Sequence, residues 1–144
     1  MLAITRLKAL PPELVDLERE ASKQGVNFLG RLIDEWHTGS NRFDKPGECL
    51  LMASVAGNMV AIGGLNVDPY KSIGDTARLR RLYVASNFRR RGVGEALVCA
   101  LLKEASGTFR AVRLSTDTEA AAAFYVRLGF SAIEDETATH IKIF

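Results

Sequence analysis

Cysteine and histidine are scarce in this sequence. Among 144 residues there are two cysteines, Cys49 and Cys99, and two histidines, His37 and His140. Two thiols in apolar surroundings make no disulfide framework, and the histidines lie too far apart in sequence to share zinc-ligand spacing. We therefore expect a protein of a reducing compartment, the cytoplasm, with no metal site.

A long apolar run is also missing. No stretch approaches the roughly 18 consecutive apolar residues that a membrane helix needs, and the first ten residues mix polar and apolar types, unlike a targeting signal. The composition, 47% hydrophobic and 25% charged, is ordinary for a globular protein. A chain of this length can bury a core without disulfides, so we expect one domain over residues 1–144 and no membrane partner.

Turn signals and hydrophobic periodicity divide the chain into alternating strands and helices. Proline can open a helix near residue 11, Gly57-Asn58 predicts a hairpin turn, and glycines end two later helices. The expected strands are 2–7, 49–55, 59–65, 78–84, 112–116, 130–133 and 139–144, and the expected helices are 11–20, 28–36, 92–106 and 119–128. This order predicts an α/β (α+β) fold, a mixed sheet with helices on both faces.

The predicted strand at residues 78–84 has an irregular apolar pattern. Leu79 is followed by Leu82 and Val84, and a step of three cannot keep one face of a strand whose side chains alternate. A β-bulge near Arg80 and Arg81 would restore the phase. Partial burial of both faces is the alternative, and the sequence does not separate the two.

Positive charge gathers in one short stretch although the net charge is only +2. Within it, Arg89-Arg90-Arg91-Gly92-Val93-Gly94 lies between a strand and an amphipathic helix. A helix start offers free N–H groups and a partial positive charge, and glycine lets a ligand approach the backbone. The segment suits a pyrophosphate, whereas a basic, solvated turn is the plainer alternative. The dinucleotide fingerprint fails because Leu97 stands at its third glycine, and the Walker pattern is absent.

Two longer segments resemble motifs of the GNAT acetyltransferase superfamily. The string from Leu79 to Leu97 resembles the acetyl-CoA motif. That motif consists of Arg or Gln, any two residues, Gly, any one residue, and then Gly or Ala, and Arg89, Gly92 and Gly94 match it. The string Glu119-Ala120-Ala121-Ala122-Ala123-Phe124-Tyr125-Val126-Arg127-Leu128-Gly129-Phe130 resembles the later, alanine-rich motif with Tyr before Leu-Gly-Phe. The resemblance covers roughly residues 53–144 and implies a mostly antiparallel GNAT-like sheet and an N-acetyltransferase that uses acetyl-CoA.

The resemblance also implies a set of site residues. Tyr125 is expected near the thioester sulfur, where its hydroxyl would act as the catalytic acid. Backbone atoms of Leu82, Tyr83 and Val84 are expected to hold the pantetheine arm, and a contact from Thr118 is implied where the family often has Asn. The pyrophosphate is expected at the loop formed by Arg89, Arg90, Arg91, Gly92, Val93, Gly94 and Glu95.

One departure affects the catalytic base. Many members of the family carry Glu where this chain has Arg78, and an arginine cannot accept the proton of an amine. The remaining acidic candidates are Glu35, Glu48, Asp68 and Asp75, each of which we expect to be a solvated surface charge. A water chain to bulk solvent is the other route.

The acceptor is expected to be an amine-bearing small molecule or peptide, framed by residues 28–46 and the closing hairpin. An acidic turn, Glu134-Asp135-Glu136, would favour a cationic amine or be merely solvated. Two other functions compete: an acyl-CoA-binding regulator without turnover, and a nucleic-acid binder that uses the arginines. The small net charge argues against nucleic acid, and a homodimer is left open.

Overall fold

The computed structural model describes residues 1–144 and contains a seven-stranded sheet with four α-helices. The strands are β1 (Leu2–Arg6), β2 (Cys49–Val55), β3 (Asn58–Val67), β4 (Thr76–Val84), β5 (Ala111–Leu114), β6 (Ser131–Ala132) and β7 (His140–Ile143). The helices are α1 (Leu14–Lys23), α2 (Phe28–Thr38), α3 (Val93–Ser106) and α4 (Glu119–Arg127), with a 3₁₀ turn η1 at Ser86–Phe88. The predicted α+β fold, with a mixed and mostly antiparallel sheet, is confirmed.

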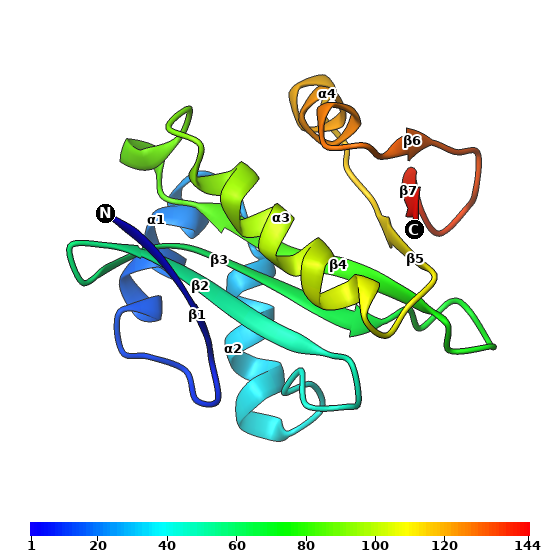
Figure 1. Cartoon of the computed structure of the whole chain (residues 1–144). Coiled ribbons are helices and arrows are strands. Elements are labelled where there is room, and N and C mark those ends of the chain that lie inside the picture. Colours follow the sequence, from blue (N-terminus) through cyan, green and yellow to red (C-terminus); the bar gives the residue numbers. More distant parts are fainter.

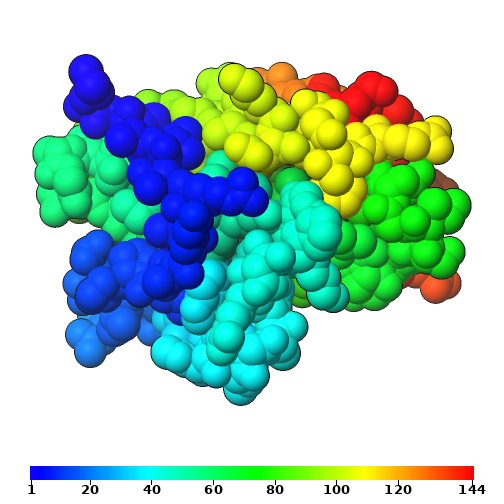
Figure 2. Space-filling view, turned by 60° about the horizontal axis from the view of Figure 1, so that its bottom comes forward, coloured from blue at the N-terminus to red at the C-terminus, as the bar shows by residue number.

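The sheet has the order β1-β2-β3-β4-β5-β7-β6. Neighbouring strands are antiparallel except β4 and β5, which run parallel. Helix α3 crosses one face of the sheet, while α1 and α2 cover the other (Figure 1). In the space-filling view the blue and cyan N-terminal third forms one side of the molecule, with the green middle segment beside it (Figure 2).

Two hydrophobic cores correspond to the two faces. On the α3 side, Leu97 and Leu101 of the helix are fully buried against strand residues such as Leu65 and Val112. On the other side, Leu29 and Leu32 of α2 pack with α1 and with Tyr83 of β4. Strand β4 therefore carries alternate side chains into both cores, and its backbone lies between them.

A β-bulge interrupts β4. Its pairing with β3 goes from Gly64↔Arg80 to Ile62↔Tyr83, so two residues of β4 lie opposite Gly63 alone. Arg81 has a positive φ of +61°, which is uncommon for a residue with a side chain. Of the two explanations left open for the irregular apolar pattern, the bulge is confirmed, and it keeps both apolar residues, Leu79 and Leu82, on the α3 face.

Strands β4 and β5 separate shortly after they meet. Their last register pair is Arg78↔Arg113, yet β4 continues to Val84. One edge of β4 beyond Arg78 is thus left without a partner strand. This opening lies in the middle of the sheet, beside α3 and α4 (Figure 1).

Some sequence expectations need correction. Helix α1 begins at Leu14 rather than at residue 11, because Pro11 lies in a turn in which its carbonyl accepts a hydrogen bond from Leu14. The closing hairpin is shorter than predicted, since β6 has only two residues. Cys49 is buried, but Cys99 lies on the exposed side of α3 despite its apolar sequence neighbours. No helix has both the length and the apolar character to cross a membrane.

Candidate functional site

The loop between β4 and α3 presents a row of free backbone donors. Every N–H group from Arg90 to Glu95 lacks a hydrogen-bond partner in the protein, and the first bond of the helix runs from Ala96 N–H to the carbonyl of Gly92. Gly92 occupies the N-cap position and offers no capping side chain. The free donors therefore combine with the positive end of the α3 dipole, an arrangement that favours phosphate.

Two residues of this loop have left-handed backbone. Gly92 has a φ of +79° and Arg90 a φ of +62°. At Arg90 an arginine thus adopts the conformation that glycine takes without cost. A left-handed conformation costs a non-glycine residue about 1–2 kcal/mol, and such strain is characteristic of functional loops. Left-handed residues in a turn aim successive N–H groups into one concavity.

The three loop arginines have different surroundings. Arg89 folds back on the protein: its Nε donates to the Val84 carbonyl at 3.0 Å, its Nη2 donates at 3.0 Å to Gln24, the C-cap of α1, and it lies over the Tyr83 ring. Arg90 and Arg91 are exposed, and Arg91 lies over the Phe88 ring. Arg89 thus braces the loop, whereas the other two contribute positive charge at its surface.

The residues expected to line the pantetheine arm differ in the direction of their backbone groups. Ala85 N–H donates to the Val60 carbonyl of β3, and adjacent residues of a strand point to opposite edges. The groups of Leu82 and Val84 therefore point to the open edge of β4, where Arg89 already occupies the Val84 carbonyl. The backbone of Tyr83 faces Ile62 of β3 instead.

The side chain of Tyr83 also lies away from the open edge, in the core beneath α1. Its hydroxyl donates to Glu20, which also accepts the Ser86 N–H. Burial raises the pKa of Tyr83, and the hydrogen bond to Glu20 raises it further. Glu20 thereby ties α1 to the end of β4, a role that nothing in the sequence pattern indicated.

Tyr125 lies on the buried face of α4. Its ring makes edge contacts with Phe124 and Phe130, with centroids 5.0 and 5.5 Å apart, and the residue is 8% exposed. The hydroxyl makes no hydrogen bond to the protein. It is not fully enclosed either, so it lies at the edge of the core, where a ligand can reach it. Burial raises the pKa of Tyr125 well above its ordinary value of 10.0, which keeps the hydroxyl protonated.

Thr118 is the N-cap of α4. Its hydroxyl oxygen accepts a hydrogen bond from Ala121 N–H at 3.1 Å. That bond confirms the predicted cap. It also engages one lone pair of the oxygen that the resemblance directs toward the cofactor.

The acidic candidates for the base are not all surface charges. Glu48 and Asp68 are 5% and 1% exposed, so the expectation of solvation was wrong for both. Glu48 accepts hydrogen bonds from Lys45, Asn66 and Val67, and Asp68 accepts them from Tyr70 and Arg113. Buried polar groups are normally hydrogen-bonded, and the two carboxylates serve as acceptors for these donors. Glu48 and Asp68 therefore have a structural role, in which they connect neighbouring segments of the chain.

Of the remaining two acids, only Glu35 is near the bulge. Its carboxylate pairs with Arg81 at 3.1 Å, and its side chain is 34% exposed. Asp75 pairs with the exposed Arg110 at the other end of β4. Glu35 is therefore the acidic side chain that α2 places beside the bulge.

Sequence reasoning missed a buried ionic cluster between β4 and β5. Arg113 is 1% exposed and contacts Asp68 and Asp135, each at 2.9 Å. Arg78 stands beside it in register. The available signal was a charged residue between Val112 and Leu114 in a predicted strand, which puts a cation on the face opposite the apolar side chains.

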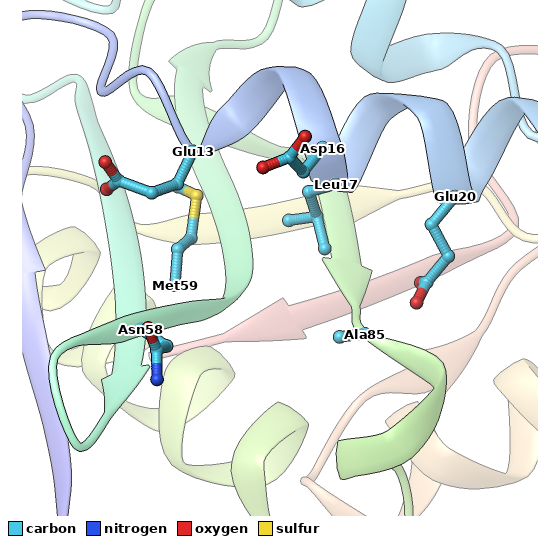
Figure 3. A pocket seen from close by; sticks show the side chains of 7 residues that line it. All are labelled: Glu13, Asp16, Leu17, Glu20, Asn58, Met59 and Ala85. Atoms are coloured by element: carbon cyan, nitrogen blue, oxygen red, sulfur yellow. The ribbon is translucent and has the colours of Figure 1, made fainter.

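A separate hollow of 260 Å³ lies between α1 and the β2–β3 turn (Figure 3). Glu13, Asp16 and Glu20 line its α1 side, with Asn58 and Met59 opposite. Carboxylates repel a pyrophosphate. The loop from Arg90 to Glu95 is therefore the better phosphate site.

Comparison with known proteins gives a consistent result. The family model described as "Acetyltransferase (GNAT) family" matches residues 12–130. A candidate acetyltransferase from Exiguobacterium sp. 255-15 is similar in structure, with a TM-score of 0.88 and 27% identity over 99% of this chain and 93% of that one. No curated protein matches the sequence.

Two more distant structures share the fold. A candidate GNAT-family acetyltransferase from Desulfovibrio desulfuricans has a TM-score of 0.74 and 22% identity over 99% of this chain and 96% of that one. A ribosomal-protein-alanine N-acetyltransferase from Brucella melitensis has a TM-score of 0.71 and 20% identity over 99% of both chains.

Proposed function

We propose a reaction for this chain on the premise that it belongs to the GNAT acetyltransferase family. Membership makes it an acyltransferase and implies an acyl-CoA donor and an amine acceptor. Within that frame, residues 1–144 act as one N-acetyltransferase domain that moves an acetyl group from acetyl-CoA to a primary amine of a small molecule or peptide.

The observation that carries the proposal is the run of free N–H groups from Arg90 to Glu95. These donors lie where the open edge of β4 leads into the N-terminus of α3. A pyrophosphate needs several donors converging from one side, and a helix start after left-handed residues supplies them. Arg90 and Arg91 add attraction for the anionic donor at longer range.

The thiol end of the donor fits along the open edge of β4. Leu82 directs its backbone groups there, as does the N–H of Val84, and an extended amide chain can pair with them like an added strand. A Cβ on Gly94 would lie 3.4 Å from Val84 and 3.5 Å from Phe124. The start of α3 thus packs against β4 and α4 without overlap. The opening between β4 and β5 remains as the path for the extended amide chain of the donor.

Acetyl transfer forms a C–N bond and breaks a C–S bond. N–H groups of the bulged strand would stabilise the negative charge on the carbonyl oxygen. The Tyr125 hydroxyl would donate a hydrogen bond to the departing thiolate. Because burial holds the pKa of Tyr125 above that of a thiol, the tyrosine keeps its own proton, and solvent supplies the proton that the thiolate finally takes up.

The amine must lose a proton before it attacks, since alkyl ammonium groups titrate near pH 10. Glu35 is the acidic side chain at the bulge, and water can relay the proton from there to solvent. Holding both substrates side by side is expected to supply much of the acceleration.

A thiol-release assay with acetyl-CoA and a panel of amines tests the proposal. An amine-dependent release of CoA supports it. Tight acetyl-CoA binding without release for any amine would indicate a non-catalytic regulator. Failure to bind acetyl-CoA, together with binding of a nucleic acid, would replace it with the basic-patch alternative.

A further inference from the structure

Arg78 and Arg113 form the centre of an unusual cluster on the sheet face opposite α3. They are register partners on the parallel strands β4 and β5. Their sequence neighbours Ala77, Leu79, Val112 and Leu114 all point into the α3 core. Alternation therefore places both guanidinium groups on the face that α2 shares.

The hydrogen-bonding needs of Arg113 are largely met within the protein. Its Nη1 donates to Asp68 at 2.9 Å, and its Nη2 donates to Asp135 at 2.9 Å and to Thr137 at 2.6 Å. Hydrogen bonds from Thr137 lower the pKa of Asp135, and the nearby Arg113 adds to the effect, so this partner stays ionised. Arg113 is thus a structural cation.

Arg78 is less deeply buried than Arg113 and is not fully satisfied. Its Nη2 donates to Ser115 at 2.9 Å. Its Nη1 is fully enclosed, makes no hydrogen bond, and lies 3.8 Å from Asp68, whose carboxylate already serves Arg113 and Tyr70. The side chain is only 10% exposed. A buried charged donor without a hydrogen bond is costly, so an anion bound beside Arg78 would be stabilised by this guanidinium.

Tyr70 covers a face of Arg78 but not its whole edge, since Nε makes no hydrogen bond and, unlike Nη1, is not fully enclosed. Its ring centroid lies 5.0 Å from the guanidinium carbon, and Tyr70 itself is 58% exposed. Stacking occupies a face of a guanidinium, whereas the N–H donors lie in its plane, where a carboxylate or phosphate binds.

The cluster continues toward the bulge. Arg80 lies on the same face and makes no ion pair or hydrogen bond with the protein, and Arg81 pairs with Glu35. The arginines 78, 80, 81 and 113 together outnumber their carboxylate neighbours Asp68, Asp135 and Glu35. With a rise of about 3.3 Å per residue, Arg78 lies roughly 10 Å from the bulge, which is within reach of one small molecule.

We propose that the acceptor is an amine that also carries an anionic group, and that the Arg78 guanidinium, assisted by Arg80, binds this group while the amine faces the bulge. The inference rests on the proposed acetyl transfer and adds its substrate class. It departs from the cationic acceptor suggested by the Glu134–Glu136 turn, because Asp135 of that turn is engaged by Arg113 and Thr137.

Matched acceptors test the proposal. Amino acids are compared with their own carboxamides, and phosphoethanolamine with ethanolamine, in the acetyl-CoA thiol-release assay. Calorimetric titration of the CoA-loaded protein with the N-acetyl derivatives of the same compounds gives a readout independent of turnover. The carboxylate pairs and the phosphate pair distinguish the two sources of the anionic group.

We expect kcat/KM for the anionic member of a pair to exceed that of the neutral member by about 10- to 100-fold, the range for a charge-assisted hydrogen bond. Arg78→Gln keeps a donor for Ser115 and should abolish the preference without loss of acetyl-CoA affinity. Arg110→Gln, at an exposed arginine paired with Asp75, should leave the preference intact. If Arg78→Gln does not fold, Arg80→Gln should reduce the preference by a smaller factor.

Equal rates and equal product affinities for charged and neutral members would overturn the anionic acceptor while leaving acetyl transfer standing. A preference for neutral or cationic amines would overturn it as well. Absence of both acetyl-CoA binding and thiol release would instead defeat the proposed function itself.

Discussion

Gly92 offers a direct test of the phosphate site because the chain provides a matched control. Gly92 and Gly25 share a φ of +79°, and a Cβ on either would meet nothing within 4 Å. Gly92→Glu and Gly25→Glu therefore carry the same backbone strain, about 1–2 kcal/mol in the free energy of unfolding. Only Gly92 lies at the free N–H groups of α3.

The expected loss of affinity follows from charge. A glutamate carboxylate about 6 Å from a doubly charged pyrophosphate, at an effective dielectric constant of about 40, costs about 3 kcal/mol. The Kd for acetyl-CoA should therefore rise by about 100-fold in Gly92→Glu. In Gly25→Glu it should stay near the parent value, and the Gly92→Glu effect should shrink as salt is added.

Isothermal titration with acetyl-CoA at two salt concentrations measures both effects, and melting curves establish that the two variants are equally destabilised. Gly94→Glu is a less clean probe, because its side chain would start 3.4 Å from Val84 and disturb packing. An unchanged Kd in Gly92→Glu, or an equal loss in Gly25→Glu, would refute the placement of the pyrophosphate.

Other predictions concern catalysis, alkaline stability and packing. Tyr125→Phe should keep the fold and the acetyl-CoA affinity but lower kcat about 100-fold; an unchanged kcat with a lowered Tm would make the tyrosine structural. Burial raises the pKa of Cys49 from 9.0 to about 11. Because the unfolded thiol ionises first, the free energy of unfolding should fall by about 1 kcal/mol between pH 8.5 and 10. Urea unfolding of Cys49→Ala should lack this decline, and a decline that persists in the variant would assign it to other groups. Gly64→Ala should destabilise the protein by about 1–3 kcal/mol, because the new Cβ would overlap the Phe43 ring. Gly30→Ala, inside α2 and with the nearest neighbour of the new Cβ at 3.6 Å, should stabilise it by up to about 1 kcal/mol. Equal melting temperatures of the two variants would contradict both expectations.

Local patterns predicted the elements that surround the donor site. The step from Leu79 to Leu82 predicted either a bulge or partial burial of both faces, and the structure has the bulge, with Arg81 in left-handed backbone. The apolar spacing of Val93, Leu97 and Leu101 predicted α3, and all three are buried. Such features depend on residues a few positions apart, so periodicity is enough to find them.

Burial of charged side chains was not predictable in the same way. Glu48 is enclosed because Asn66 and Val67, far along the chain, donate hydrogen bonds to it. Asp68 is enclosed because the register of β4 and β5 places Arg113 beside it. Both depend on contacts between distant segments, and composition alone favours the solvated alternative for an acidic residue.

The bulge in β4 explains why the donor half of the site was easier to predict than the acceptor half. After the bulge, the strand is expected to serve the donor through backbone groups at its open edge and through the start of α3, which require glycines and a regular spacing rather than particular side chains. Before the bulge, the same strand presents the side chains of Arg78 and Arg80 to the opposite face. A substitution at residue 78 can therefore change the acceptor and leave the donor site as it was. Arg78 in place of the family's frequent Glu accordingly points to a different acceptor and a different route for the amine proton, while donor binding can be retained.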